Sequence, residues 1–372
     1  MDDESERIRV HLIEGWRTVI VDAQVKFGQV INSITERLST QYAADHNATP
    51  VDNKYGWIFG IRYVPPGMDG DRHEQLWIHP EMMHGEFKLK YNVNRGPDEN
   101  SDQGRLELRV RYFPARLHEI DRDYRIIFTL LHKQVFAQYM KLDHVKPELA
   151  VQLTVLELRR KFPDMSPKAA NLIWNENDQD ISYRNFFPQA VLERNKVKDL
   201  RRDVKREYTR IEADGMEASQ GKRKDKSQKL TKDFFEAAVM FLQLIKRHLF
   251  EFDRECFHVK IGLGWSVKVP VAIGPDDQIS HLDAAGAHRR MTDFGQINEL
   301  TISYPECTLA LHVQSKQEPL VLTCESQQEL DNLADLIDGY CRGTRTPKQG
   351  SILKQYRREL PTLPYEQRNN RV

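Results

Sequence analysis

The clearest candidate for binding chemistry is a run of cations in the string ERNKVKDLRRDVKREYTRI, residues 193–211. Apolar residues recur there every three or four positions, which predicts an amphipathic helix with one face toward a core. These residues are Val197, Leu200, Val204, Tyr208 and Ile211. The cations beside this stripe are Lys198, Arg201, Arg202 and Lys205, with Arg194, Lys196 and Arg206 nearby.

Such a basic face can contact several phosphates at once, since each cation near an anionic leaflet contributes about 1 kcal/mol within a Debye length. The alternative is an ordinary solvated helix face with internal ion pairs to Asp199 and Asp203. Nucleic acid is not an expected partner, because no aromatic stacking platform lies beside the cations and positive and negative residues balance at 55 each.

Three strings in the C-terminal third imitate phosphoryl-transfer motifs, namely Gly262-Leu263-Gly264, Val271-Ala272-Ile273 and Asp293-Phe294-Gly295. The imitation fails chemically, because Gly274 stands where a phosphate-pairing lysine is needed and no catalytic loop precedes the last string. We interpret the strings as strand and turn residues. No other catalytic motif and no metal-ligand spacing occurs, so the sequence predicts no enzyme activity, no catalytic residue, no metal and no cofactor.

The tail contains the spacing RxxPxxP at Arg358, Pro361 and Pro364. Proline at every third position fits the three-residue turn of a polyproline helix, and the leading arginine can pair with the acidic rim of an SH3 groove. The spacing therefore predicts an SH3 ligand, although PxxP alone is common by chance.

Three lobes must position these residues. Residues 6–115 contain short alternating runs and one helical pattern from Phe27 to Leu38, typical of a ubiquitin-like β-grasp sheet. Residues 116–250 show only helical periodicity, with a polar, mobile connection over 212–232. Residues 251–343 return to alternation and end in one helix, the outline of a pleckstrin-like lobe. Residues 344–372 are polar and are expected to form a disordered linker.

This order of lobes is the FERM arrangement, an α+β multidomain cloverleaf with an acyl-CoA-binding-protein-like helical lobe and a pleckstrin or phosphotyrosine-binding-like third lobe. Specific strings resemble the N-terminal region of the focal adhesion kinase family, a family of non-receptor protein tyrosine kinases. They are LRVRYFP at 108–114, VLELRRKFPDM at 155–165, FFPQAVLE at 186–193, FDRECF at 252–257, AIGPDDQIS at 272–280 and DLIDGYCR at 335–342.

The resemblance implies a regulatory module that restrains a kinase domain of the same chain, although these 372 residues contain none. It implies a basic patch for phosphatidylinositol bisphosphate, whose cations match Lys196, Lys198, Arg201 and Arg202. It also implies that Phe162 and Met165 insert into the kinase. Both lie in the Pro-interrupted break KFPDMSP, and a loop anchor packed into its own lobe is the alternative reading.

The leading hypothesis is thus a FERM module in focal adhesion and integrin signalling that autoinhibits a tyrosine kinase and binds acidic phosphoinositides at the inner leaflet. The expected location is cytoplasmic, peripheral at the plasma membrane and focal adhesions, with Lys222-Arg223-Lys224 a potential nuclear address. The alternative is a stand-alone FERM scaffold that links receptor tails to the cortical cytoskeleton, with peptides adding to the third-lobe sheet.

Overall fold

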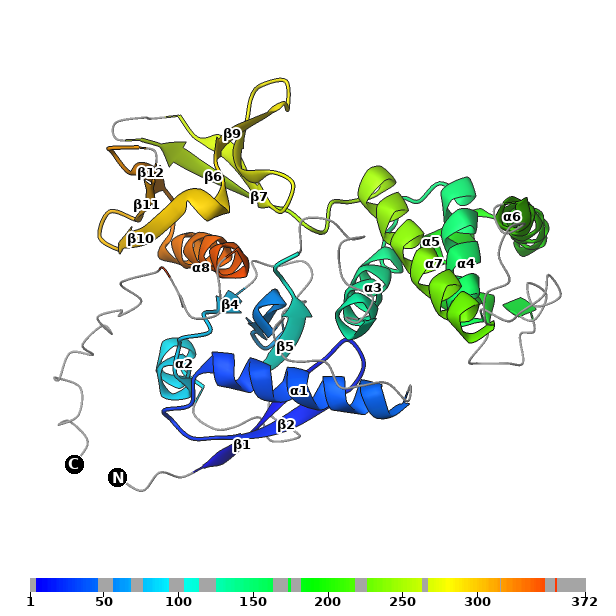
Figure 1. Ribbon diagram of the computed structural model, residues 1–372, viewed down its shortest axis with the longest axis horizontal. Helices are drawn as coiled ribbons and strands as arrows, with labels where there is room; N and C mark the ends of the chain where they lie inside the picture. Colours follow the sequence, from blue (N-terminus) through cyan, green and yellow to red (C-terminus); the bar gives the residue numbers. More distant parts are fainter. Residues whose placement is uncertain are drawn as a thin grey trace. The chain divides into compact units, whose positions relative to one another are not determined.

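The computed structural model describes residues 5–45, 56–67, 76–93, 104–113, 125–162, 173–174, 182–217, 226–262, 267–314, 316–344 and 352 (Figure 1). The chain divides into two compact units. One unit combines Met1–Ala115 with Asp253–Val372, and the other is Arg116–Phe252. Among the described residues, no helix combines the length and apolar character needed to cross a bilayer.

The first lobe is a mixed five-stranded sheet in the order β2-β1-β5-β3-β4, covered by a helix. β1 pairs antiparallel with β2 and parallel with β5. The elements are β1 Glu6–His11, β2 Trp16–Val21, α1 Phe27–Asp45, β3 Phe59–Val64, β4 Leu76–Ile78, α2 His84–Tyr91 and β5 Arg105–Val110. Helix α1 buries Phe27, Val30 and Ile34 at the helical spacing visible in the sequence.

The second lobe is a helical bundle. Its helices are α3 Arg125–Tyr139, α4 Pro147–Lys161, α5 Gln189–Arg194, α6 Val197–Glu217 and α7 Lys226–His248. Helix α4 is the centre of this bundle, because it packs against both α6 and α7. It begins with Pro147 in the first turn, where a missing N–H costs nothing, and its Leu153 and Val155 are completely buried.

The third lobe is a seven-stranded antiparallel sheet in the order β10-β11-β12-β6-β7-β8-β9, closed by helix α8. Its elements are β6 Glu255–Ile261, β7 Val269–Gly274, β8 Gln278–Leu282, β9 His288–Thr292, β10 Ile297–Ser303, β11 Thr308–Val313, β12 Leu320–Thr323 and α8 Gln327–Gly343. The Ser326 hydroxyl caps α8 by accepting the Glu329 N–H, and Leu330, Leu333 and Ile337 face the sheet core.

The predicted three-lobed fold is confirmed: a β-grasp sheet, a helical middle lobe and a pleckstrin-like sheet with a capping helix. Helix α2 and strands β8 and β9 were missing from the prediction, because these segments are short and their apolar patterns are weak. The mobile connection predicted over 212–232 is wrong at both ends, since α6 continues to Glu217 and α7 begins at Lys226. Good helix formers there outweigh the polar composition.

The predicted disordered linker over 344–372 is wrong at one position, Ile352. Its side chain is 5% exposed and belongs to the third-lobe core. Its carbonyl accepts the Leu300 N–H from β10 at 3.2 Å, and its own N–H donates to the Asp338 carboxylate at 2.9 Å. A single aliphatic residue among polar neighbours gives no periodic signal, so the sequence did not reveal this contact. The other residues from 345 onward lie outside the described part of the chain.

Gly339 allows α8 to approach the end of the first lobe. A methyl group at this position would overlap the Tyr112 ring, so Gly339→Ala should lower the free energy of unfolding by about 1–3 kcal/mol, typical of overpacking. Gly295→Ala is the matched control, because nothing lies within 4 Å of its added carbon. Urea unfolding followed by tryptophan fluorescence measures both, and equal stabilities would contradict the close packing.

Candidate functional site

Helix α6 carries the predicted basic face, and it is anchored through a narrow apolar stripe. Leu200, Val204 and Tyr208 are buried in a core cluster that also contains Val151 and Val155 of α4. Val197, the first residue of the stripe, is 36% exposed at the start of the helix. Only one side of α6 is therefore committed to the bundle, and the remaining positions are free to meet solvent.

All the cations predicted to bind lipid are exposed. They are Lys196, Lys198, Arg201, Arg202 and Lys205. Four of them lie on α6, and successive positions at about 100° per residue place Lys198, Arg201 and Lys205 within roughly a sixth of the helix circumference. Lys198, Arg201 and Lys205 therefore lie together on one flank of α6, here called the basic flank.

Three acidic residues in the described first part of α6 occupy the other flank. Asp199, Asp203 and Glu207 recur every four residues and form a row along the helix. Arg206 pairs with Asp203 at 3.3 Å, and Arg210 pairs with Glu207 at 2.6 Å. These cations are therefore locally neutralised.

Arg202 lies between the two rows. It contacts Asp199 at 3.2 Å and Asp203 at 3.4 Å, while its side chain stays 68% exposed. By contrast, Lys198, Arg201 and Lys205 form no ion pair with any residue that the structure describes. The alternative of an internally paired helix face accordingly fits Arg202 and Arg206 but not the basic flank.

Phe162 lies at the C-terminal end of α4, where its N–H donates to the Leu158 carbonyl at 2.8 Å. Its side chain is half-buried and packs against the same cluster that holds Leu200 and Val204 of α6. This position agrees better with a loop anchor than with a fully outward side chain. Met165 lies outside the described residues, as do Arg358, Pro361 and Pro364 of the predicted SH3 ligand, so these roles stay predictions.

Where the structure describes the kinase-like strings, their residues form part of the third-lobe sheet and core. Val271-Ala272-Ile273 forms the buried centre of β7. Phe294 is 1% exposed and stacks on Tyr340 at a centroid distance of 4.7 Å. Within the described ranges, no group of three His, Cys, Asp or Glu side chains is placed to hold a metal ion.

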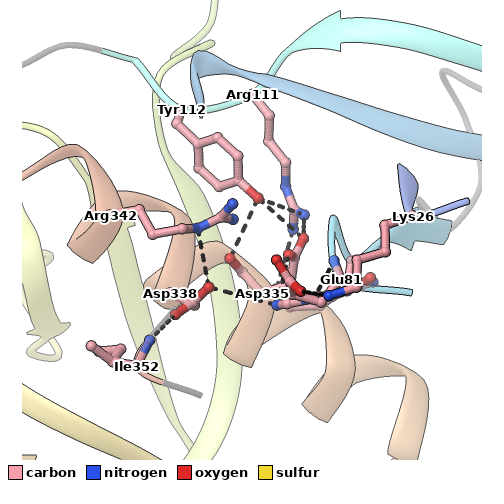
Figure 2. A network of polar contacts seen from close by, with 10 residues as sticks. Lys26, Glu81, Arg111, Tyr112, Asp335, Asp338, Arg342 and Ile352 are labelled. Atoms are coloured by element: carbon pink, nitrogen blue, oxygen red, sulfur yellow. Dashed lines mark hydrogen bonds and ion pairs between the residues drawn. The ribbon is translucent and has the colours of Figure 1, made fainter. Parts of the chain in front are cut away.

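A buried polar network, which the sequence analysis did not identify, joins the first and third lobes (Figure 2). Arg111, directly after β5, forms an ion pair with Asp335 of α8. Its guanidinium also lies over the Trp77 ring at 4.4 Å and donates to the Asn332 carbonyl at 3.2 Å. The Tyr112 hydroxyl donates to the same Asp335 carboxylate at 3.2 Å.

Asp338, one turn further along α8, is completely buried and is the second centre of the network. Its carboxylate contacts Arg342 Nε at 3.1 Å, His79 Nε2 at 3.6 Å and the Ile352 N–H (Figure 2). Burial acts to raise the pKa of Asp338, but contacts with His79, Arg342 and Ile352 lower it overall. Burial lowers the pKa of His79, although its contact with Asp338 acts in the opposite direction.

The signal that could have found this network was two acidic residues on the apolar side of a helix. Asp335 and Asp338 flank Leu336 and Ile337 in the string DLIDGYCR. Charged side chains on a buried helix face require partners. Arg342 and Ile352 are close to Asp338 in sequence, but the first-lobe partners Arg111, Tyr112 and His79 are more than 200 residues away, and only the fold identifies them.

Removing Arg111 should destabilise the unit formed by these two lobes. Arg111→Met leaves the Asp335 carboxylate buried without its cation, and such a loss costs about 3–5 kcal/mol. The double variant Arg111→Met with Asp335→Leu removes both charges and should recover most of this loss. Thermal unfolding of the three proteins is the measurement, and a double variant that is less stable than Arg111→Met would contradict the pairing.

Comparison with known proteins agrees with this geometry. Residues 259–351 match the family described as FAK1/PYK2, FERM domain C-lobe. The chain is 23% identical over 347 residues to the inactive tyrosine-protein kinase kin-32 of Caenorhabditis elegans, which covers 89% of this chain and 36% of that protein. The chain therefore spans little more than a third of the length of this relative.

Solved FERM structures show the same fold. The MyTH4-FERM MF2 domain of Dictyostelium discoideum myosin VII superposes with a TM-score of 0.54 at 12% identity, covering 91% of this chain and 58% of the other. The FERM and C-terminal domain complex of Drosophila Merlin superposes with a TM-score of 0.53 at 12% identity, covering 91% and 97%. The chain therefore has the FERM fold, its residues 259–351 match the FAK1/PYK2 type of C-terminal lobe, and it is similar to an inactive tyrosine-protein kinase.

Proposed function

We propose that this chain is a regulatory FERM module that binds acidic phosphoinositides through the basic flank of α6 and holds a tyrosine kinase domain inactive. The observation that carries the lipid half is the separation of charge on α6. Lys198, Arg201 and Lys205 project from one flank without ion pairs among the described residues, while the acidic row lies on the other.

This separation matters energetically. A cation already paired with a carboxylate gains little from a phosphate, because the ligand must first displace its partner. Unpaired, exposed cations keep their whole electrostatic attraction, at about 1 kcal/mol each near an anionic surface. The basic flank can therefore contribute about 3 kcal/mol, and Lys196 just before α6 extends the same surface.

The kinase half draws support from the FAK1/PYK2 type of the C-terminal lobe and from the similarity to a protein named as an inactive tyrosine-protein kinase. Phe162 and the buried stripe of α6 pack into one core cluster. A kinase bound at the Phe162 corner and a membrane bound at the basic flank would thus use one lobe. The kinase and the membrane would then compete for this lobe, so that lipid binding relieves the inhibition of the kinase.

Peptide binding is the basis of the alternative function, a scaffold for receptor or integrin-associated tails. Peptides could add to the edge strand β10, but the Leu300 N–H of that strand already donates to Ile352 of the same chain. A tail would have to displace Ile352 at this point. SH3 domains that bind Arg358, Pro361 and Pro364 remain proposed partners under either function.

The lipid half predicts a specific loss of vesicle binding. Lys198→Ala, Arg201→Ala and Lys205→Ala together should weaken co-sedimentation with phosphatidylinositol bisphosphate vesicles by about 100-fold, since each cation contributes about 1 kcal/mol. The matched control is Arg206→Ala with Arg210→Ala, which removes cations of the same helix that are paired. Equal losses in the two variants, or no loss in the first, would disprove the role of the basic flank.

The kinase half predicts inhibition that lipid reverses. A separately prepared kinase domain from the parent protein should lose activity when it is titrated with this chain, and vesicles containing phosphatidylinositol bisphosphate should restore the activity. The triple alanine variant of the basic flank should inhibit equally well but resist restoration. A kinase whose activity does not respond to the chain would leave the scaffold function as the better account.

A further inference from the structure

Two cysteines lie opposite each other at one end of the third-lobe sheet. Strands β11 and β12, which are labelled in Figure 1, pair antiparallel with Thr308 opposite Thr323. The same register places Cys307 opposite Cys324, one step beyond this pair. The Cys324 N–H donates to the Cys307 carbonyl at 2.9 Å, so the two backbones stay paired at this position. Both residues are free thiols in the structure.

This placement suits a disulfide bond. Opposite residues that are hydrogen-bonded in an antiparallel pair have Cα atoms about 5.5 Å apart, within the range of about 4.4–6.8 Å that disulfides require. Cys324 belongs to the third-lobe core, like Leu322 two residues before it. The Cys307 thiol contributes to a raised pKa of Cys324, which shows that the two sulfurs lie close enough to interact.

The turn between β10 and β11 does not by itself call for a cysteine. The Cys307 N–H donates to the Tyr304 carbonyl at 3.2 Å and closes this turn, and the backbone of Cys307 has a φ of 50°. Glycine and asparagine adopt this left-handed conformation more readily than other residues do. The presence of a strained cysteine opposite a second cysteine is therefore better explained by the chemistry of the thiol than by the turn.

The two thiols differ in exposure. Cys307 is half-buried, and its Sγ donates to the Tyr304 carbonyl at 3.6 Å. Cys324 is only 6% exposed. Burial raises the pKa of the Cys324 thiol to about 12, and the Glu329 carboxylate and Cys307 act in the same direction. A buried thiol with a raised pKa is a poor target for oxidants, so an oxidant in solution reacts first with Cys307.

We propose that Cys307 and Cys324 form a reversible disulfide when the chain meets hydrogen peroxide or a related hydroperoxide. In the first step the Cys307 sulfur attacks one peroxide oxygen and the O–O bond breaks. The leaving hydroxide takes the thiol proton as water, and Cys307 becomes a sulfenic acid. In the second step the Cys324 sulfur attacks the Cys307 sulfur and the S–O bond breaks. The second hydroxide leaves with the Cys324 proton, so two thiols are oxidised and one peroxide is reduced to two waters.

The bond would strengthen the junction of the first and third lobes. Cys324 lies just before Ser326, which caps α8. On the other side, the Tyr304 hydroxyl donates to the Asp331 carboxylate of α8 at 3.1 Å, and Lys90 of α2 pairs with the same carboxylate at 3.0 Å. A disulfide would thus tie the turn that carries Tyr304 to the start of α8. It would also restrict the unfolded chain by closing a loop.

The test treats the full chain with hydrogen peroxide, blocks the remaining thiols with N-ethylmaleimide and digests it with trypsin and Glu-C protease. Cleavage after Lys316 and Glu325 places the cysteines of the third lobe on different peptides, so mass spectrometry identifies the bridged pair. We expect peptides joined through Cys307 and Cys324 that dithiothreitol separates. The matched control is Cys256→Ser, which removes the exposed cysteine and should leave this bridge unchanged.

Oxidation should also raise the Tm of the unchanged chain by roughly 5 °C or more, and dithiothreitol should reverse the rise. Cys307→Ser should show neither the bridge nor a rise in Tm with peroxide. If this variant does not fold, N-ethylmaleimide labelling of the unchanged chain decides, because oxidation should remove two reactive thiols. The proposal is overturned by oxidation of Cys307 to a sulfinic acid without a bridge, by a bridge through Cys256 or Cys341, by a bridge between two chains, or by a bridge that leaves the Tm unchanged.

Discussion

The ion pair between Arg111 and Asp335 is the interaction on which the unit of the first and third lobes depends. Both side chains are 3% exposed, so each would be costly to bury alone. Each is surrounded by further partners, with the Trp77 ring over Arg111 and the Tyr112 hydroxyl on Asp335. A misaligned approach of the two lobes would leave a charge unpaired, and this penalty selects one arrangement.

Asp338 extends the same constraint to the chain beyond α8. It receives Arg342 from its own helix, His79 from the first lobe and the N–H of Ile352 from the following segment. Because a completely buried carboxylate needs all of its partners, the placement of Ile352 on β10 is linked energetically to the packing of the lobes. Gly339 directly follows Asp338 in α8 and leaves room for Tyr112.

Ion pairs on the surface have a different effect from the buried ion pairs of α8. On α6 the acidic row neutralises Arg206 and Arg210, whereas the basic flank is left unpaired among the described residues. On the first-lobe sheet the buried carboxylate of Glu107 pairs with Arg62, Arg105 and Arg109. In both places local ion pairs decide which cations stay available, so a count of Lys and Arg would not identify a binding surface. The chain has no net charge, so an electropositive surface can arise only from such local segregation of charge.

The sequence alone determined the three lobes, the buried stripe of α6 and the position of its cations, because these follow from periodicities of two and 3.6 residues that local geometry imposes. It also explained why the kinase-like strings could not act as a kinase. Only the tertiary structure decided the partners of Arg111 and Asp338, the docking of Ile352, and the common face of Arg9, Arg105 and Arg109. Most of these contacts join segments far apart in the chain, and no local pattern encodes which distant segment will meet which.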